Sequence, residues 1–288
     1  MNDYLLSILL GVVEGLTEFL PVSSTAHLRF TEAALHLDLG DPYWKMFSIV
    51  IQLGAILCLP IYFWDRIMSF LATFPGGRRG NKTAITHPIG LTLIAFVCTA
   101  GPSFLLTKLI GKHLEDLVLM ASALIIGGIV MWIVDAIYGK NMGGGSESEA
   151  AEELERMSLP QAIWIGLCQI LSAVFPGTSR SMVTIAAGQV SGLSRTAALE
   201  YSFLLSIPTM IAATGYDLLK AFKGPDRVHI DAHGWMLLAI GFVISFVVAY
   251  GVVAWFMQWV RRRGFVPFAI YRIVVGAAVL ARVYGIGR

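Results

Sequence analysis

Residues 11–28 read GVVEGLTEFLPVSSTAHL, a stretch that decides the fold because it places ionisable side chains inside otherwise apolar sequence. Glu14 and Glu18 are four residues apart and would therefore share one face of a helix. Pro21 interrupts that helix, and the hydroxyl-bearing residues after it are typical of the start of a new one. The stretch predicts a broken helix with carboxylates on its first arm and a hydroxyl-capped N-terminus on its second.

The two carboxylates need a physical reason to lie in such apolar sequence. Burying one ionisable side chain deep in a bilayer costs about 2.5–3.5 kcal/mol even on a lenient insertion scale. Glu14 and Glu18 should therefore be paired, bind a metal ion or face water, and we interpret them, with His27, as functional groups. The alternative interpretation is an N-terminal helix that lies at the membrane interface with its carboxylates in water.

The overall composition is that of a polytopic membrane protein. Hydrophobic residues make up 56% of the 288 residues, charged residues only 14%, and the mean hydropathy is +0.72. A net charge of +2, scattered over short loops, argues against a nucleic-acid partner. The three cysteines match no zinc or redox spacing. The N-terminus lacks the basic region of a signal peptide, so we expect the first apolar segment to remain in the mature protein.

Six apolar runs are each long enough to cross a hydrocarbon core of about 30 Å. They span residues 44–64, 86–108, 116–138, 196–219, 235–259 and 266–284. Between the third and fourth runs, the segment 139–157 is polar and acidic, which is typical of a linker with a solvated helical end. We therefore predict three crossings on each side of this linker.

The broken-helix pattern occurs a second time after the linker, where residues 166–181 read GLCQILSAVFPGTSRS. The alignment, with the residue of the first break named second, pairs Gln169 with Glu14, Pro176 with Pro21, Thr178 with Ser23 and Ser179 with Ser24. Each half of the chain is therefore predicted to be one broken hairpin followed by three crossings.

An odd number of crossings per half means that the second half enters the membrane from the opposite side. The predicted fold class is an all-α polytopic membrane protein, an inverted repeat of two halves, each a re-entrant helical hairpin plus three transmembrane helices. We expect a single membrane domain over 1–288, with repeats at 1–138 and 158–288 around the polar acidic linker 139–157. Broken backbone at membrane depth is tolerated only beside protein or a water-filled cavity, so the two hairpins should meet at a central site.

The second break has residue types that bind phosphate. Gly177 allows a tight turn, and Arg180 offers a bidentate fork to phosphate oxygens. Free N–H groups at the new helix N-terminus also favour an anion. Hydroxyls beside or just beyond that N-terminus come from Thr178, Ser179, Ser181 and Thr184. The alternative is that Arg180 simply extends to the membrane interface.

Together the two breaks supply the groups for phosphoryl transfer. Glu14 and Glu18 could hold a divalent cation, Mg²⁺ or Ca²⁺, which would be shared with substrate phosphate oxygens. Arg180 and the helix N-termini would neutralise charge on the transferred phosphoryl group. Either His27 or Ser24 would attack phosphorus or activate the attacking group, and the residues leave this choice open.

These motifs, with VIQLG at 50–54 and PFAIYR at 267–272, resemble those of the undecaprenyl-diphosphate phosphatase family, also called bacitracin resistance proteins. The resemblance covers nearly the whole chain. It implies an integral membrane enzyme, dependent on a divalent metal, that removes the terminal phosphate of undecaprenyl diphosphate. Such an enzyme regenerates the lipid carrier for peptidoglycan and other cell-wall polymers and confers resistance to the antibiotic bacitracin.

The family's motifs fall on Glu14, Glu18, Ser24, His27, Ser179, Arg180 and Thr184, and Arg272 matches a further family arginine. The candidate catalytic residues are Glu14, Glu18, Ser24, His27 and Arg180, with Glu14 and Glu18 also the candidate metal ligands. The candidate substrate-binding residues are Ser23, Thr25, Gln52, Thr178, Ser179, Ser181, Thr184 and Arg272.

Two of these residues lie within crossings. Arg272 sits too deep in its crossing to reach the interface easily, so we expect it to contact phosphate. Gln52 would either line the cavity or form an ordinary hydrogen bond between helices.

Ala26 and Met182 stand where family members often carry glycine, and neither substitution puts a proposed role in doubt.

Basic residues of loop 65–85, the linker and the run Arg261 to Arg263 lie close to membrane ends, which makes that side cytoplasmic by the positive-inside rule. Both termini and the cavity would then face the outside of the bacterial cell membrane. Because burial of a lipid chain yields about 0.8 kcal/mol per CH₂, the polyprenyl tail would stay in the bilayer and the diphosphate would enter through a lateral opening.

The expected partners are a polyprenyl diphosphate lipid and the surrounding membrane lipids, with no nucleic acid. A homodimer is left open. The runner-up function is a transporter that flips a polyprenyl phosphate lipid, because inverted repeats with broken helices are also transporter architecture.

Overall fold

The computed structural model describes residues 2–38, 40–110, 116–139, 146–223 and 230–285, and every regular element in them is a helix. The predicted all-α class is confirmed. In chain order the helices are α1 (Asp3–Thr17), α2 (Ser24–Ala34), α3 (Pro42–Ile56), α4 (Cys58–Tyr62), α5 (Trp64–Thr73), α6 (Pro88–Ile110), α7 (Leu117–Tyr138), α8 (Glu147–Arg156), α9 (Leu159–Val174), α10 (Arg180–Val190), α11 (Arg195–Lys223), α12 (Ala232–Arg263) and α13 (Val266–Val283). Residues 140–145 of the predicted linker lie outside the described residues.

Within the described residues, six helical segments are long and apolar enough to cross a membrane. They cover Pro42–Tyr62, Pro88–Leu106, Leu117–Tyr138, Arg195–Phe222, Ala232–Arg263 and Val266–Val283. Each coincides with one of the predicted apolar runs, so the prediction of a multi-pass membrane protein is confirmed. The pair α8 and α9, which meet at a bend of 100°, passes the same test only when taken together.

The two broken hairpins, α1–α2 and α9–α10, share an unusual backbone conformation at the break. Their second helices, α2 and α10, have 11 residues each. Each begins after a serine in left-handed backbone, with φ of 72° at Ser23 and 71° at Ser179. Such φ values are uncommon for residues other than glycine, so their occurrence at both breaks agrees with the repeated sequence pattern.

The register of this repeat differs by one residue from the sequence alignment. Aligning the prolines sets Thr178 opposite Ser23, whereas the helix starts set Ser179 there. The additional residue is Gly177, whose φ is +91° and where a Cβ would come within 2.5 Å of the carbonyl oxygen of Met120. Only glycine fits that turn, and the second break is therefore one residue longer between its proline and its helix.

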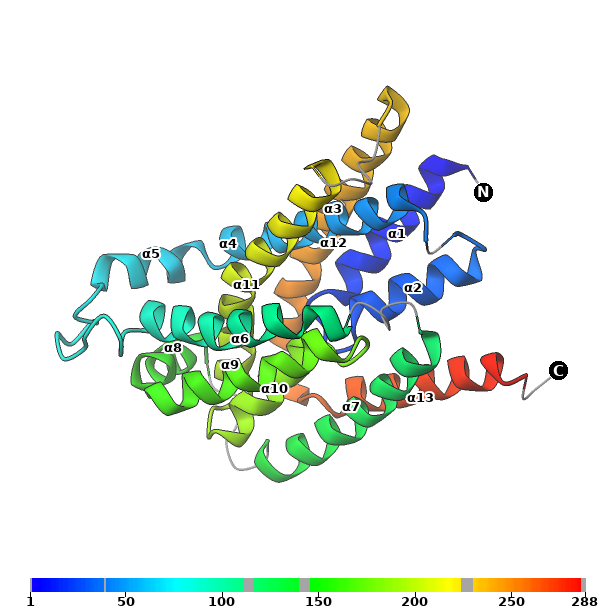
Figure 1. The fold of residues 1–288 in the computed structure, drawn as a ribbon. Coiled ribbons are helices and arrows are strands. Elements are labelled where there is room, and N and C mark those ends of the chain that lie inside the picture. The colour runs from blue at the N-terminus through cyan, green and yellow to red at the C-terminus, as the bar shows by residue number, and fades with distance from the viewer. Residues whose placement is uncertain (1, 39, 111–115, 140–145, 224–229, 286–288) are drawn as a thin grey trace.

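The hairpins pack across the two halves of the chain. Helix α1 lies on α12, α9 lies on α6, and α7 lies along α13. Glycine allows the close approach, since a Cβ at Gly11 would come within 2.8 Å of the carbonyl oxygen of Gly241. In Figure 1 the start of α1 and the end of α13 lie at one end of the molecule, and α5 and α8 lie at the other. The opposite membrane orientation of the two halves stays a prediction.

The helical end of the predicted linker is α8, and one face of it is packed against the protein. A capping box between Ser146 and Glu149 defines its start. Ala150 and Leu154 are buried, while Glu152 is exposed. The acidic composition thus describes the solvated face of this helix, and small apolar residues on the other face attach it to the membrane helices.

Candidate active site

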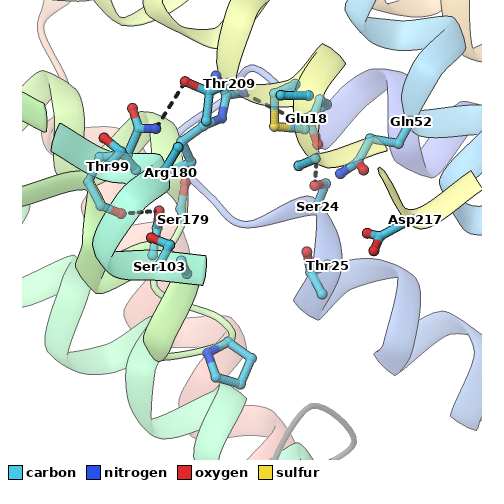
Figure 2. Close-up of a pocket in the computed structure, with 18 of the residues that line it drawn as sticks. Glu18, Ser24, Thr25, Gln52, Thr99, Ser103, Ser179, Arg180, Thr209 and Asp217 are labelled. Carbon is cyan, nitrogen blue, oxygen red and sulfur yellow. Dashed lines mark hydrogen bonds and ion pairs between the residues drawn. The ribbon is translucent and has the colours of Figure 1, made fainter. Parts of the chain in front are cut away.

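A cavity of about 510 Å³ lies where the two breaks meet. The breaks contribute to its wall the residues Glu18, Ser23, Ser24, Thr25, Pro176, Gly177, Ser179 and Arg180. The rest of the wall comes from α3, α6, α9 and α11. In Figure 2, Ser179 and Arg180 lie on one side of the cavity, and Ser24, Thr25 and Asp217 lie on the other.

Glu18 joins the two breaks directly. Its Oε1 accepts a hydrogen bond from Nη2 of Arg180 at 3.1 Å, and its Oε2 accepts one from Oγ of Ser24 at 2.5 Å. Only 6% of Glu18 is exposed, and hydrogen bonds to a charged group are strongest where water is excluded. A carboxylate and an arginine that are 162 positions apart in the sequence thus meet in one cavity, as the two motifs predict.

These three side chains have complementary chemistry. A hydroxyl hydrogen-bonded to a carboxylate, as Ser24 is to Glu18, is an arrangement in which a base activates a nucleophile. Ser24 is the first residue of α2 and Arg180 the first residue of α10, and both line the cavity. Two helices therefore begin at this cavity. The free N–H groups of their first turns are suited to bind an anion with several oxygen atoms.

Glu14 lies one helical turn before Glu18 on α1 and does not line the cavity. It is 1% exposed, and neither of its carboxylate oxygens has a hydrogen-bond partner among the described residues. A buried carboxylate without a hydrogen-bond partner is costly, and a bound cation would remove that cost. No group of three or more His, Cys, Asp or Glu side chains suited to a metal occurs in the described part of the chain. Two glutamates still fit Mg²⁺, which commonly takes one or two carboxylates plus substrate phosphates.

His27, a candidate nucleophile, does not line the cavity. Its Nδ1 lies 2.8 Å from the carbonyl oxygen of Ser23, which can only accept, so Nδ1 carries the proton. Its Nε2 lies 2.9 Å from the hydroxyl of Tyr271, and the two rings stack with centroids 5.6 Å apart. The structure thus directs the His27 ring toward α13, and of the two candidate nucleophiles only Ser24 lies in the cavity beside a base.

Arg272, predicted to contact phosphate, also lies outside the cavity wall. It is fully buried, with 0% of its surface exposed. Its guanidinium donates, over distances of 2.9 to 3.3 Å, to the backbone carbonyl oxygens of Pro21, Ala123, Leu124, Gly177 and Thr178. In this structure backbone carbonyls therefore occupy the guanidinium, and the predicted phosphate contact stays a prediction.

Three of the predicted phosphate-binding hydroxyls, those of Ser181, Thr184 and Thr178, do not line the cavity. Ser181 is 1% exposed and donates to the carbonyl oxygen of Leu20 at 3.0 Å. Thr184 is equally buried and lies 2.6 Å from the hydroxyl of Ser202. Thr178 lines a separate apolar groove between α7, α9 and α10. Closeness in sequence to Arg180 does not place Ser181 and Thr184 in the cavity, because successive residues of a helix point to different sides, and Thr178 precedes that helix.

Several polar residues of the wall are not among the predicted site residues: Thr99, Ser103, Gln169, Ser172, Thr209 and Asp217. The repeat offers a signal for Gln169 alone, because it aligns with Glu14. Its Nε2 donates to Oγ1 of Thr209 at 3.2 Å. Gln52 both lines the cavity and accepts from Oγ1 of Thr214 at 3.4 Å, so the two alternatives for this residue hold together.

Comparison with known proteins gives a consistent result. A family model described as bacitracin resistance protein BacA matches residues 7–278. A protein named undecaprenyl-diphosphatase from Koribacter versatilis (strain Ellin345) is 68% identical, and the match covers 98% of each chain. Two others with the same name are each 40% identical: that of Caldanaerobacter subterraneus subsp. tengcongensis, with 94% of this chain and 93% of the relative covered, and that of Thermus thermophilus, with 94% of each.

Proposed function

Since the chain belongs to the bacitracin resistance protein BacA family, we propose that it is a membrane phosphatase that hydrolyses undecaprenyl diphosphate to undecaprenyl phosphate and inorganic phosphate. The observation that carries this proposal is the position of Glu18 between Ser24 and Arg180 in a cavity where two helices begin. That arrangement combines a nucleophile, a base and an anion site. The product would serve again as lipid carrier for cell-wall synthesis.

Binding of the diphosphate would use the second break and both helix N-termini. The Arg180 fork and the free N–H groups that begin α2 and α10 would hold phosphate oxygens, with the Ser179 hydroxyl beside them. The same groups face the charge that builds on the transferred phosphoryl group, and they need no rearrangement to stabilise it. The Glu18 carboxylate would keep the Arg180 guanidinium in place until the substrate arrives.

The chemical step would begin when Oγ of Ser24 attacks the terminal phosphorus while Glu18 takes the hydroxyl proton. The anhydride P–O bond breaks, and undecaprenyl phosphate leaves with its electron pair and the proton from Glu18. Water then attacks the phosphorus of the phosphoserine while Glu18 accepts a proton from that water. The bond between phosphorus and Oγ of Ser24 breaks, Glu18 returns the proton to Oγ, and phosphate departs. A Ser24→Ala variant should retain no covalent label from substrate labelled in its terminal phosphate, whereas full phosphate release by this variant would refute the attack by Ser24.

The divalent cation expected for this reaction would be held by Glu14 and Glu18, because Glu14 is a buried carboxylate without a partner among the described residues. When bound, Mg²⁺ or Ca²⁺ would supply positive charge that neutralises the diphosphate oxygens.

The apolar part of the wall suits the lipid tail. Phe96 and Ala100 on α6 and Ala213 on α11 belong to this wall. Near them, the rings of Phe104 and Tyr216 meet edge to face with centroids 6.4 Å apart, and both are exposed. A polyprenyl chain that stays in the bilayer would therefore enter between α6 and α11. The proposed setting is the bacterial cell membrane, with this cavity open toward the outside of the cell.

The test is release of inorganic phosphate from undecaprenyl diphosphate by the purified protein in detergent. Detergent micelles have no second side, so a protein that only flips lipid phosphates would release none. Release by the natural protein and its loss in Glu18→Gln would support the phosphatase. No release from either protein, with intact folding, would refute it in favour of the transporter.

A further inference from the structure

The guanidinium of Arg272 connects three separate segments of the chain. Its Nη1 donates to the carbonyl oxygen of Pro21 in the first break, at 2.9 Å. Its Nη2 donates to those of Gly177 and Thr178 in the second break, at 3.2 and 3.0 Å. The remaining bonds, from Nη2 and Nε, reach Ala123 and Leu124 on α7 at 3.2 and 3.3 Å. We call this set of five bonds the carbonyl clasp.

The clasp satisfies carbonyl groups that the breaks leave without helical partners. A buried backbone C=O that lacks a hydrogen bond is costly, and water does not reach this point because Arg272 is fully buried. The clasp also needs space in α7. A Cβ at Gly127 would clash with Nη2 of Arg272, and a Cβ at Gly128 would come within 2.8 Å of the carbonyl oxygen of Ala269.

The clasped carbonyls lie close in sequence to the reacting groups. Pro21 is three residues from both Glu18 and Ser24, and Thr178 is two residues from Arg180. Because one rigid guanidinium bonds to both breaks, its position sets the distance between the first break and the second. The 3.1 Å contact between Glu18 and Arg180 depends on that distance.

We propose that Arg272 is a positioning residue that holds the two breaks in register, so that Glu18, Ser24 and Arg180 meet, and that it does not bind the substrate. This inference rests on the proposed phosphatase function. A displacement of about 1 Å between reacting groups can lower a rate by about a hundredfold, so loss of the clasp should lower kcat by more than it raises KM.

The experiment uses the full-length protein in detergent and two variants that disturb the clasp in different ways. Arg272→Met removes the guanidinium. Gly127→Ala keeps it but adds a methyl group that would clash with Nη2 and come within 2.8 Å of Cε of Met182. The matched control is Gly251→Ala on α12, where a Cβ would have nothing within 4 Å. Hydrogen–deuterium exchange is compared over all peptides, and kcat and KM are measured with undecaprenyl diphosphate.

The expected result is faster exchange confined to both breaks, around residues 18–25 and 176–182, in the two clasp variants and not in the control. In the same variants kcat should fall, by about tenfold in Gly127→Ala and about a hundredfold in Arg272→Met, with a smaller change in KM. If Arg272→Met does not fold, Gly127→Ala alone decides the question.

Three outcomes would overturn the inference. The first is unchanged exchange at the breaks, and the second is faster exchange spread evenly over the protein, as expected for a general loss of stability. The third is a raised KM with kcat retained, as expected for a phosphate contact. Absence of phosphatase activity in the natural protein would refute the proposed function by itself, and the exchange data would still decide whether Arg272 aligns the breaks.

Discussion

The two breaks have nearly the same backbone and nearly opposite chemistry. In both, an 11-residue helix begins after a serine whose φ is close to +70°. The first break contributes a carboxylate and a hydroxyl, Glu18 and Ser24, and the second contributes the Arg180 guanidinium. The comparison teaches that a repeated backbone can bring two helix N-termini to one cavity, while different side chains at equivalent positions provide the base and nucleophile on one side and the anion site on the other.

The breaks also differ in how firmly they are held. The side chain of Ser179 accepts a hydrogen bond from the N–H of Met182 at 3.3 Å, whereas Ser23 makes no side-chain cap bond at all. The Ser181 hydroxyl further connects the second break to the carbonyl oxygen of Leu20 in the first. The anion site is therefore more rigidly capped than the nucleophile site.

Glu18→Gln tests the comparison most severely, because Glu18 is the side chain that bonds to both breaks. The amide cannot take a proton from Ser24 and cannot form an ion pair with Arg180. We expect phosphate release to fall by about a thousandfold or more, within the range for loss of a general base. The control is Glu32→Gln on α2, a carboxylate that is also buried and bonds to Arg29 and Ser48 outside the cavity. Equal losses in both variants would contradict the special role of Glu18.

Arg180→Lys asks whether the second break needs the fork of a guanidinium or only a positive charge. A lysine ammonium cannot bond to Glu18 and to a phosphate in the same bidentate way. We expect phosphate release to fall by about a hundredfold. Arg29→Lys is the matched control, since Arg29 pairs with Glu32 on α2 away from the cavity. Full activity of Arg180→Lys would show that the second break needs only a positive charge at this position and not a guanidinium.

Glu14→Gln tests whether the metal is held only by the first break. The variant makes the two halves alike at this position, because the residue aligned with Glu14 in the second half is already an amide, Gln169. Replacing the unpartnered carboxylate should weaken binding of Mn²⁺, used as a spectroscopic probe, by at least about tenfold. Electron paramagnetic resonance of the substrate-free protein measures this without reference to activity. Unchanged Mn²⁺ affinity would remove Glu14 from the metal site.

Ser23→Gly and Ser179→Gly compare the two caps, with the smallest expected effects. Glycine adopts the left-handed backbone without strain at either position. Only Ser179→Gly loses side-chain hydrogen bonds, those with the N–H of Met182 and the hydroxyl of Ser181. One such bond is typically worth about 1 kcal/mol, so we expect phosphate release to fall by at least about fivefold in Ser179→Gly and less in Ser23→Gly. A larger loss in Ser23→Gly would show that the first break depends more on its serine than the hydrogen bonds indicate.

Much of this fold can be predicted from the sequence because the bilayer restricts which residues and backbone conformations can cross it. Apolar runs predict the six spans, since an exposed polar backbone cannot cross lipid. Pro21 and Pro176 mark the two breaks, and the cost of an intramembrane carboxylate marks Glu18 as functional. The same reasoning cannot tell where a side chain points once the chain has turned.

His27 and Arg272 show that limit. Both belong to motifs of the resemblance, yet the structure turns His27 toward Tyr271 and surrounds Arg272 with carbonyl groups. Asp217 shows the converse, because a lone acidic residue near the end of α11 resembles an interface group and lines the cavity instead. The direction in which a side chain points depends on how the helices pack, and local sequence does not contain that information.

By itself, the sequence determined the crossings, the positions of the breaks and the chemical character of each break, because hydropathy, proline geometry and side-chain type are local properties. Only the tertiary structure decided that Glu18 lies between Ser24 and Arg180, that Gly177 shifts the second break by one residue, and that Arg272 bonds to both breaks. These facts depend on close packing between segments far apart in the chain, where a difference of one residue or one rotamer decides which groups touch.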